Sequence, residues 1–123
     1  MQKRLAFFAI GLLSLLATAV RVDAHAFLVR AEPQVGSRVT KAPNEVRIWF
    51  SEPIGTRLSS IKVFDASEKQ VDKMDTHLDG HDRALLHISL RPSLAPGAYK
   101  VIWRVTSADT HVTGGDFHFQ IVP

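Results

Sequence analysis

The sequence has 123 residues, a length typical of one domain, and it contains no cysteine. Disulfides, thiolate metal sites, iron–sulfur clusters and cysteine nucleophiles are therefore excluded, and any metal must be held by nitrogen, oxygen or methionine sulfur. The formal net charge of +3 makes no case for nucleic-acid binding, because much of it belongs to the N-terminal leader.

The N-terminus reads as a targeting segment. A basic start is followed by an apolar run over residues 5–20 and by short residues ending at Ala24. This pattern predicts a signal peptide over residues 1–24 that is cleaved after Ala24. An uncleaved membrane anchor is the weaker alternative, because the run is shorter than the ~20 residues of a spanning helix. Cleavage leaves residues 25–123 with no membrane anchor and reduces the net side-chain charge from +3 to +1.

Short runs of alternating apolar and polar residues follow, separated by turn signals, as is typical of antiparallel sheets. Residues 26–31 predict an edge strand, residues 34–44 a loop, and residues 45–50 a second strand that ends before Pro53. The next predicted elements are a strand over 60–65, a short strand around 70–74 and an exposed turn over 76–83.

The C-terminal half carries the strongest strand signals. Residues 84–90, 98–106 and 116–122 predict strands, and the middle one alternates Tyr99, Val101, Trp103 and Val105 on one face. No helical period of useful length follows residue 24. The chain is therefore predicted to be all-β, an immunoglobulin-like Greek-key β-sandwich or barrel of about seven strands. The absence of a cysteine pair argues against an antibody-type domain.

The first residue after the predicted cleavage is a histidine. As residue one, His25 offers a free α-amine and an imidazole on the same residue, and the two can close a chelate ring on one metal ion. An internal histidine cannot do this. Cu(II) prefers tetragonal nitrogen and oxygen ligation and stands at the top of the divalent affinity order. His25 therefore points to copper.

A second candidate element is Asp109-Thr110-His111. In an extended segment, residues two apart point to the same side, so Asp109 and His111 are expected to face one ion with Thr110 turned away. The segment follows the strongest predicted strand, and ligands beside a rigid strand suit a binding site. Alone, an Asp-x-His pair more often consists of solvated polar residues.

Together, the motifs resemble the copper-resistance protein CopC family over nearly all of residues 25–123. The residues that carry the resemblance are His25-Ala26, Glu32-Pro33, Gly36-Ser37, Phe50-Ser51-Glu52-Pro53, Pro96-Gly97-Ala98-Tyr99, Trp103-Arg104-Val105, Ser107-Ala108-Asp109-Thr110-His111, Gly114, Phe117 and Phe119. The pairing of an N-terminal histidine with Ser-x-Asp-x-His is the most specific part.

The resemblance implies a periplasmic copper-binding protein of copper resistance, trafficking or uptake, with an immunoglobulin-like fold and no enzymatic activity. It implies Cu(II) ligation by the amine and ring of His25, by Asp109 and by His111, with Glu52 as a weaker, outer ligand. It also implies an inner-membrane copper importer of the CopD type as a partner.

One region departs from the family pattern. Some members carry a methionine-rich loop in mid-chain that binds Cu(I), whereas here Met74 stands alone with His77 and His81 nearby. Soft thioethers select Cu(I), and one thioether makes a poor site, so weak Cu(I) binding is expected. The two histidines with Asp79 and Asp82 could form a second weak metal patch, although a solvated loop is the simpler interpretation.

Three alternatives remain open at this point. One is a copper oxidative enzyme with an N-terminal histidine, which the predicted carboxylate ligand and the few long loops disfavour. Another is a β-sandwich interaction domain that binds no metal. Zn(II) is the second candidate metal, because two imidazoles, an amine and a carboxylate also suit a tetrahedral site.

Overall fold

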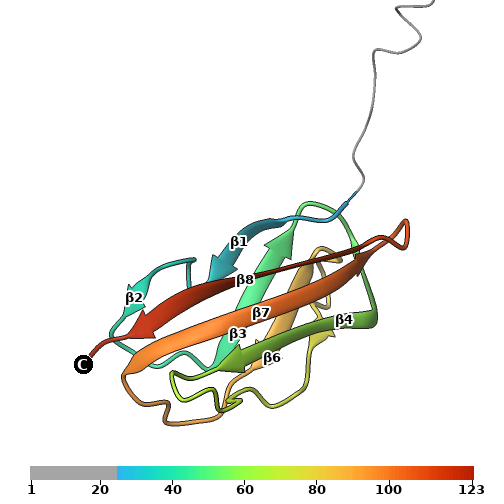
Figure 1. The fold of residues 1–123 in the computed structure, drawn as a ribbon. Coiled ribbons are helices and arrows are strands. Elements are labelled where there is room, and N and C mark those ends of the chain that lie inside the picture. The colour runs from blue at the N-terminus through green and yellow to red at the C-terminus, as the bar shows by residue number, and fades with distance from the viewer. Residues whose placement is uncertain (1–24) are drawn as a thin grey trace, which may run out of the picture.

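The computed structural model describes residues 25–123, which form two four-stranded sheets packed against each other (Figure 1). The strands are β1 (Leu28–Glu32), β2 (Arg38–Val39), β3 (Glu45–Phe50), β4 (Ile54–Phe64), β5 (His77–Leu78), β6 (Leu85–Ser89), β7 (Gly97–Ser107) and β8 (Val112–Ile121). One sheet has the order β1-β3-β6-β5 and the other β2-β8-β7-β4. The chain crosses repeatedly between the sheets, which confirms the predicted all-β Greek-key sandwich.

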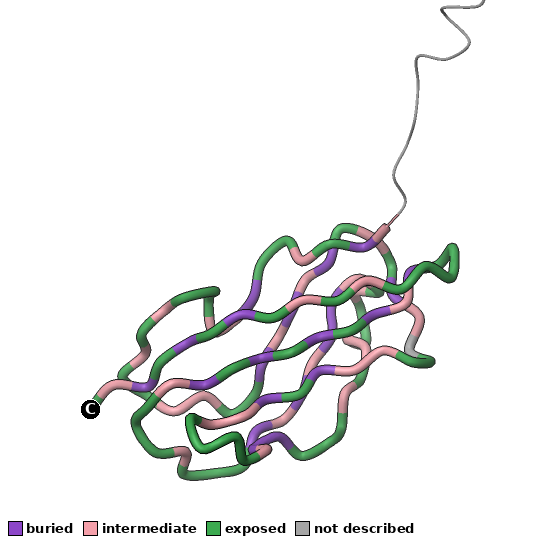
Figure 2. Tube along the Cα trace, viewed as in Figure 1, coloured by how far each residue is buried: buried purple, intermediate pink, exposed green. Residues whose placement is uncertain are grey.

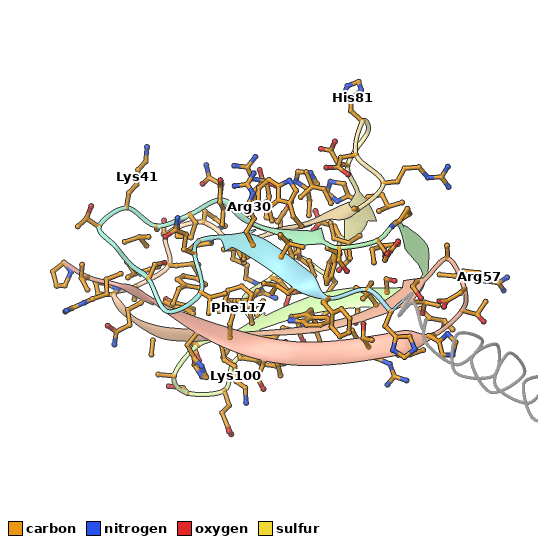
Figure 3. All side chains as sticks on the ribbon, turned by 90° about the horizontal axis from the view of Figure 1, so that it is seen from above. Arg30, Lys41, Arg57, His81, Lys100 and Phe117 are labelled. Carbon is orange, nitrogen blue, oxygen red and sulfur yellow. The ribbon has the colours of Figure 1, made fainter. Side chains whose placement is uncertain are left out.

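The core lies between the sheets and follows the alternation of the sequence. Every second residue is buried in β3, in β7 from Tyr99 onward and in β8 from Phe117 onward, and Figure 2 shows this as alternating colours along the strands. Phe117 points into this layer, whereas Lys100 points to solvent (Figure 3). Each fully buried large apolar side chain stabilises the fold by roughly 1.5–3 kcal/mol. The pattern of period two therefore specifies both the strands and their inward faces.

The shortest elements differ from the sequence-based expectation. β2 lies in the segment predicted as a loop, and β5 lies in the segment predicted as a turn. Residues 70–74 form only isolated bridges, from Gln70 to Phe64 and from Asp72 to Leu90. β4 begins at Ile54, before the predicted strand over 60–65, and a bulge between Gly55 and Ser60 interrupts its pairing. Two-residue strands are too short to show alternation, and a bulge interrupts it.

β8 begins at Val112, four residues before the predicted start, because two glycines conceal the strand pattern. Trp103 lies in the core, edge-on to Phe50 with ring centroids 5.2 Å apart, and it pairs with Gly115 across the strands. A Cβ atom at Gly115 would lie 2.7 Å from the Trp103 ring. The indole therefore requires glycine at this position.

The described part of the chain contains strands and turns, and none of its segments is a helix long and apolar enough to cross a membrane. The predicted signal peptide, residues 1–24, lies outside the described residues. Cleavage after Ala24, and with it the domain boundary at residue 25, therefore stays a prediction.

Candidate metal site

Three segments meet at one end of the sandwich: residues 25–27, the connection from β3 to β4, and the turn from β7 to β8. The N–H of Ser51 donates to the carbonyl of Phe27 at 2.8 Å, and Ile54 pairs with Ser107. Figure 1 shows the described chain beginning beside the β7–β8 turn, with the C-terminus at the opposite end. Sheet pairing thus gathers residues that are far apart in the sequence.

The β7–β8 turn holds the Asp-x-His pair. The N–H of Ser107 donates to the carbonyl of His111, and the N–H of Thr110 donates to the carbonyl of Ser107, both at 2.9 Å. Thr110 has a φ of +68°, in the left-handed region. The expected extended conformation of residues 109–111 is therefore wrong, because the hairpin must reverse here. The turn nevertheless brings the Asp109 and His111 side chains into contact.

The Asp109 carboxylate is held by two partners. The buried Ser107 hydroxyl donates to Oδ1, and Nδ1 of His111 lies 3.0 Å from Oδ2. The Ser107 hydrogen bond is the largest cause of a pKa of about 2 for Asp109; desolvation opposes it, and the contacts with His111 lower the pKa further. Asp109 is therefore anionic at all ordinary pH values, and a metal need not compete with a proton for it.

The same contact orients His111. Because a carboxylate can only accept, Nδ1 of His111 carries the hydrogen and Nε2 presents its lone pair. A carboxylate behind a histidine is the usual arrangement that fixes a metal-binding imidazole. The His111 side chain is 61% exposed, so Nε2 can be reached from solvent. The His25 ring lies beside it, with centroids 4.5 Å apart and a tilt of 52°.

The arrangement is a partial metal site. Among residues 25–123, no three His, Asp or Glu side chains stand in a ready-made metal-binding cluster. Asp109 and His111 are directed toward each other, so the Asp109 carboxylate must turn away from Nδ1 of His111 before both residues can bind the same ion. The main-chain nitrogen of His25 becomes an amine only when the chain is cut before this residue.

Glu52, the predicted weaker ligand, lies at the same end of the molecule. It is half-buried in the β3–β4 connection, between Ser51, which bonds Phe27, and Ile54, which pairs with Ser107. Glu52 is thus bracketed by residues that contact both other segments of the site.

Sequence reasoning assigned no role to two hydroxyls near these residues, those of Ser107 and Thr113. Ser107 occupies an inward position of β7 two residues before Asp109, and Thr113 donates to the carbonyl of Ala26 at 2.7 Å. A buried hydroxyl next to an Asp-x-His pair is a signal that could have identified Ser107. Thr113 has no such signal, because its partner is 87 residues away.

A second group of histidines lies on the outer face of the β1-β3-β6-β5 sheet. Nδ1 of His87 lies 2.6 Å from Glu45, and its Nε2 lies 2.8 Å from Asp79. The His77 ring stacks on His87, with centroids 5.2 Å apart and an angle of 10°. His81 is exposed and points away from the sandwich (Figure 3). The suggested patch of His77 with His81 is therefore not formed.

Comparison with known proteins agrees with this fold and sequence pattern. The CopC domain family matches residues 28–122. "Protein YobA" of Escherichia coli K12 is 31% identical over 114 residues, covering 93% of this chain and 92% of YobA. The crystal structure of CopC from Methylosinus trichosporium OB3b superimposes with a TM-score of 0.74 at 31% identity, covering 80% of this chain and 95% of that one.

A further structural neighbour is PcoC, described as a methionine-rich copper resistance protein from Escherichia coli. It matches with a TM-score of 0.69 at 30% identity, over 80% of this chain and all of PcoC. The family resemblance that rested on motifs is thereby confirmed. With a family match from end to end of the sandwich, the chain belongs to the CopC family, whose named members here include a copper resistance protein.

Proposed function

We propose that this protein is a periplasmic carrier of one Cu(II) ion. Its ligands are the α-amine and imidazole of His25, the imidazole of His111 and the carboxylate of Asp109, with Glu52 as a weaker, outer ligand. The observation that carries the proposal is the His25–His111 ring pair, 4.5 Å apart, beside Asp109, whose pKa is lowered to about 2.

The donor set suits Cu(II) among the common divalent metals. Three nitrogens and one carboxylate oxygen match its tetragonal preference, and Cu(II) outcompetes other first-row ions at such sites. Zn(II) accepts the same donors in a tetrahedral arrangement. Direct competition between the two ions therefore decides the metal, and the affinity order favours copper.

The exposure of the site favours transport over catalysis. The side chains of His111 and Asp109 are 61% and 36% exposed, so a bound ion is accessible to a partner that takes it over. Copper is therefore carried as cargo and is not used as a catalytic cofactor. PcoC, a relative by fold and sequence, is described as a copper resistance protein.

Export and delivery complete the proposal. The predicted signal peptide directs residues 25–123 to the periplasm and creates the amine of His25 on cleavage. An inner-membrane copper importer of the CopD type is the proposed recipient. Cu(I) is bound weakly, because Met74 is the only thioether of residues 25–123, and its side chain is exposed.

The test uses protein exported by cells that express the full chain. Intact mass with and without Cu(II) should show an N-terminus at His25 and one bound ion. Electron paramagnetic resonance should show type-2 copper with nitrogen hyperfine coupling, because the chain has no thiolate. A mature N-terminus elsewhere, or a ten-fold excess of Zn(II) displacing the copper, would overturn the proposal.

A further inference from the structure

The backbone of the N-terminal segment, residues 25–27, is attached to the sandwich by two hydroxyl side chains. The Thr113 hydroxyl donates to the carbonyl of Ala26 at 2.7 Å. The Ser51 hydroxyl accepts from the N–H of Phe27 at 2.9 Å and lies 3.5 Å from the carbonyl of His25. Three consecutive residues are therefore anchored, and none of these contacts uses the His25 side chain.

The anchors come from both sheets. Ser51 directly follows β3, and Thr113 lies in β8, where it pairs with Val105 of β7. Between them, the Ala26 side chain is 1% exposed and belongs to the core. The segment thus spans the two layers at the end of the sandwich, on residues whose own positions are set by strand pairing.

We propose that Thr113 and Ser51 are positioning residues that hold the amine and ring of His25 against His111 for copper binding. This inference rests on the proposed function. Chain termini are poorly ordered unless something ties them down, and a ligand held in place binds metal more tightly than one that must be ordered on binding. Neither hydroxyl needs to contact the metal to have this effect.

The chain offers a matched control for the test. Thr113→Val removes one hydroxyl and keeps the β-branched shape that suits a strand. Thr106→Val makes the same change on the neighbouring strand β7, next to the same turn. The Thr106 hydroxyl is buried and has no hydrogen-bond partner among the described residues. Thr113→Ser keeps the hydroxyl and serves as the conservative rescue.

Each variant is exported as the full chain and titrated with Cu(II) against a competing chelator. Thr113→Val should bind Cu(II) ~10-fold more weakly than the wild type, within the range typical of residues that orient ligands. Thr113→Ser should regain most of the affinity, and Thr106→Val should match the wild type. The electron paramagnetic resonance spectrum of Thr113→Val should contain a second Cu(II) species, because the His25 amine detaches from the metal in part of the molecules.

The outcomes separate this inference from the proposed function. If the wild type itself binds Cu(II) weakly, the proposed function fails. If the wild type binds tightly and Thr113→Val binds equally well, or if Thr106→Val is weakened to the same extent, the positioning role is overturned. Circular dichroism reports folding. Should Thr113→Val not fold, Ser51→Ala removes the other anchor, and unchanged copper affinity there would overturn the inference equally.

Discussion

Two pairs of histidine rings occupy opposite kinds of environment in this molecule. His25 and His111 lie at the end of the sandwich, 4.5 Å apart and tilted by 52°. His77 and His87 lie on the outer face of one sheet, 5.2 Å apart and nearly parallel. Both pairs have carboxylates beside them, so proximity alone does not separate a metal site from a structural cluster.

The partners of the ring nitrogens make the difference. Both nitrogens of His87 face carboxylates, those of Glu45 and Asp79. A neutral imidazole has only one N–H to donate, so the two carboxylates favour the doubly protonated, positive ring, which has no lone pair for a metal. His111 uses only Nδ1 on its carboxylate, Asp109, and its side chain is largely exposed. The first arrangement joins structural elements, whereas the second can bind a metal.

The largest difference between the two pairs is expected when one histidine of each is replaced and the Cu(II) affinity is measured. His111→Ala removes one nitrogen ligand and should weaken Cu(II) by at least ~100-fold, more than the loss of an orienting residue usually costs. His87→Ala should leave the affinity unchanged. Chelator competition on the two exported variants measures both. A similar loss in both proteins would mean that the two pairs are not functionally distinct.

A smaller effect is expected at Ser107. Ser107→Ala removes the hydrogen bond that does most to lower the pKa of Asp109, and it should weaken Cu(II) by ~10-fold. Ser59→Ala is the matched control. The Ser59 hydroxyl donates to Gly55 and accepts from Thr106, at the same end of the sandwich. The control should lose thermal stability but not copper affinity, and equal copper loss in both would remove the special role of Ser107.

The smallest expected effect is the pH dependence of the His87 cluster. Burial by itself lowers the pKa of His87, but the hydrogen bonds to Glu45 and Asp79 outweigh it and raise the pKa above 6.5. The stabilisation that this ring supplies is therefore complete below its unfolded value and is lost as the pH rises through the raised folded value. The pKa of Asp79 is lowered below 3.8, mainly by the N–H of His81 and then by His87, so its contribution is lost only in stronger acid.

Thermal unfolding of His87→Gln beside the wild type measures this contribution. The variant should have a Tm lower by roughly 4–8 °C near pH 5.5, the shift that ~1 kcal/mol produces in a domain of this size. The difference should shrink as the pH rises through the raised folded pKa of His87. A difference that stays constant over this range would show that the ring stabilises by packing and not by charge.

The contrast between the two pairs also shows what the sequence could predict. Alternation identified the inward faces of β3, β7 and β8, because a period of two is local information. His25 could be predicted as a ligand because a first-residue histidine carries both an amine and an imidazole. The Asp-x-His pair could be predicted from its residue types. Period-two spacing predicts the contact of Asp109 with His111 for the wrong reason, because the chain turns at Thr110 and no glycine in the segment marks the turn.

The remaining side-chain contacts form between residues that are far apart in the chain. His87 meets Glu45 because β6 pairs with β3, over a separation of 42 residues. Thr113 meets Ala26 for a similar reason. Neither contact leaves a local pattern in the sequence, so neither could be predicted before the register of the strands was known.

The central claim is that the amine and ring of His25 chelate one Cu(II) ion, and blocking that amine tests it most directly. Acetylation of the exported protein below pH 7 modifies the α-amine in preference to the lysines, because the α-amine has the lower pKa, and it leaves every side chain in place while removing the lone pair of the amine. Intact mass first confirms a single acetyl group, and circular dichroism confirms the fold. Cu(II) affinity is predicted to fall by at least ~100-fold relative to the unmodified protein, since a ligand is lost and not merely reoriented. Equal affinities in the two proteins would contradict the account.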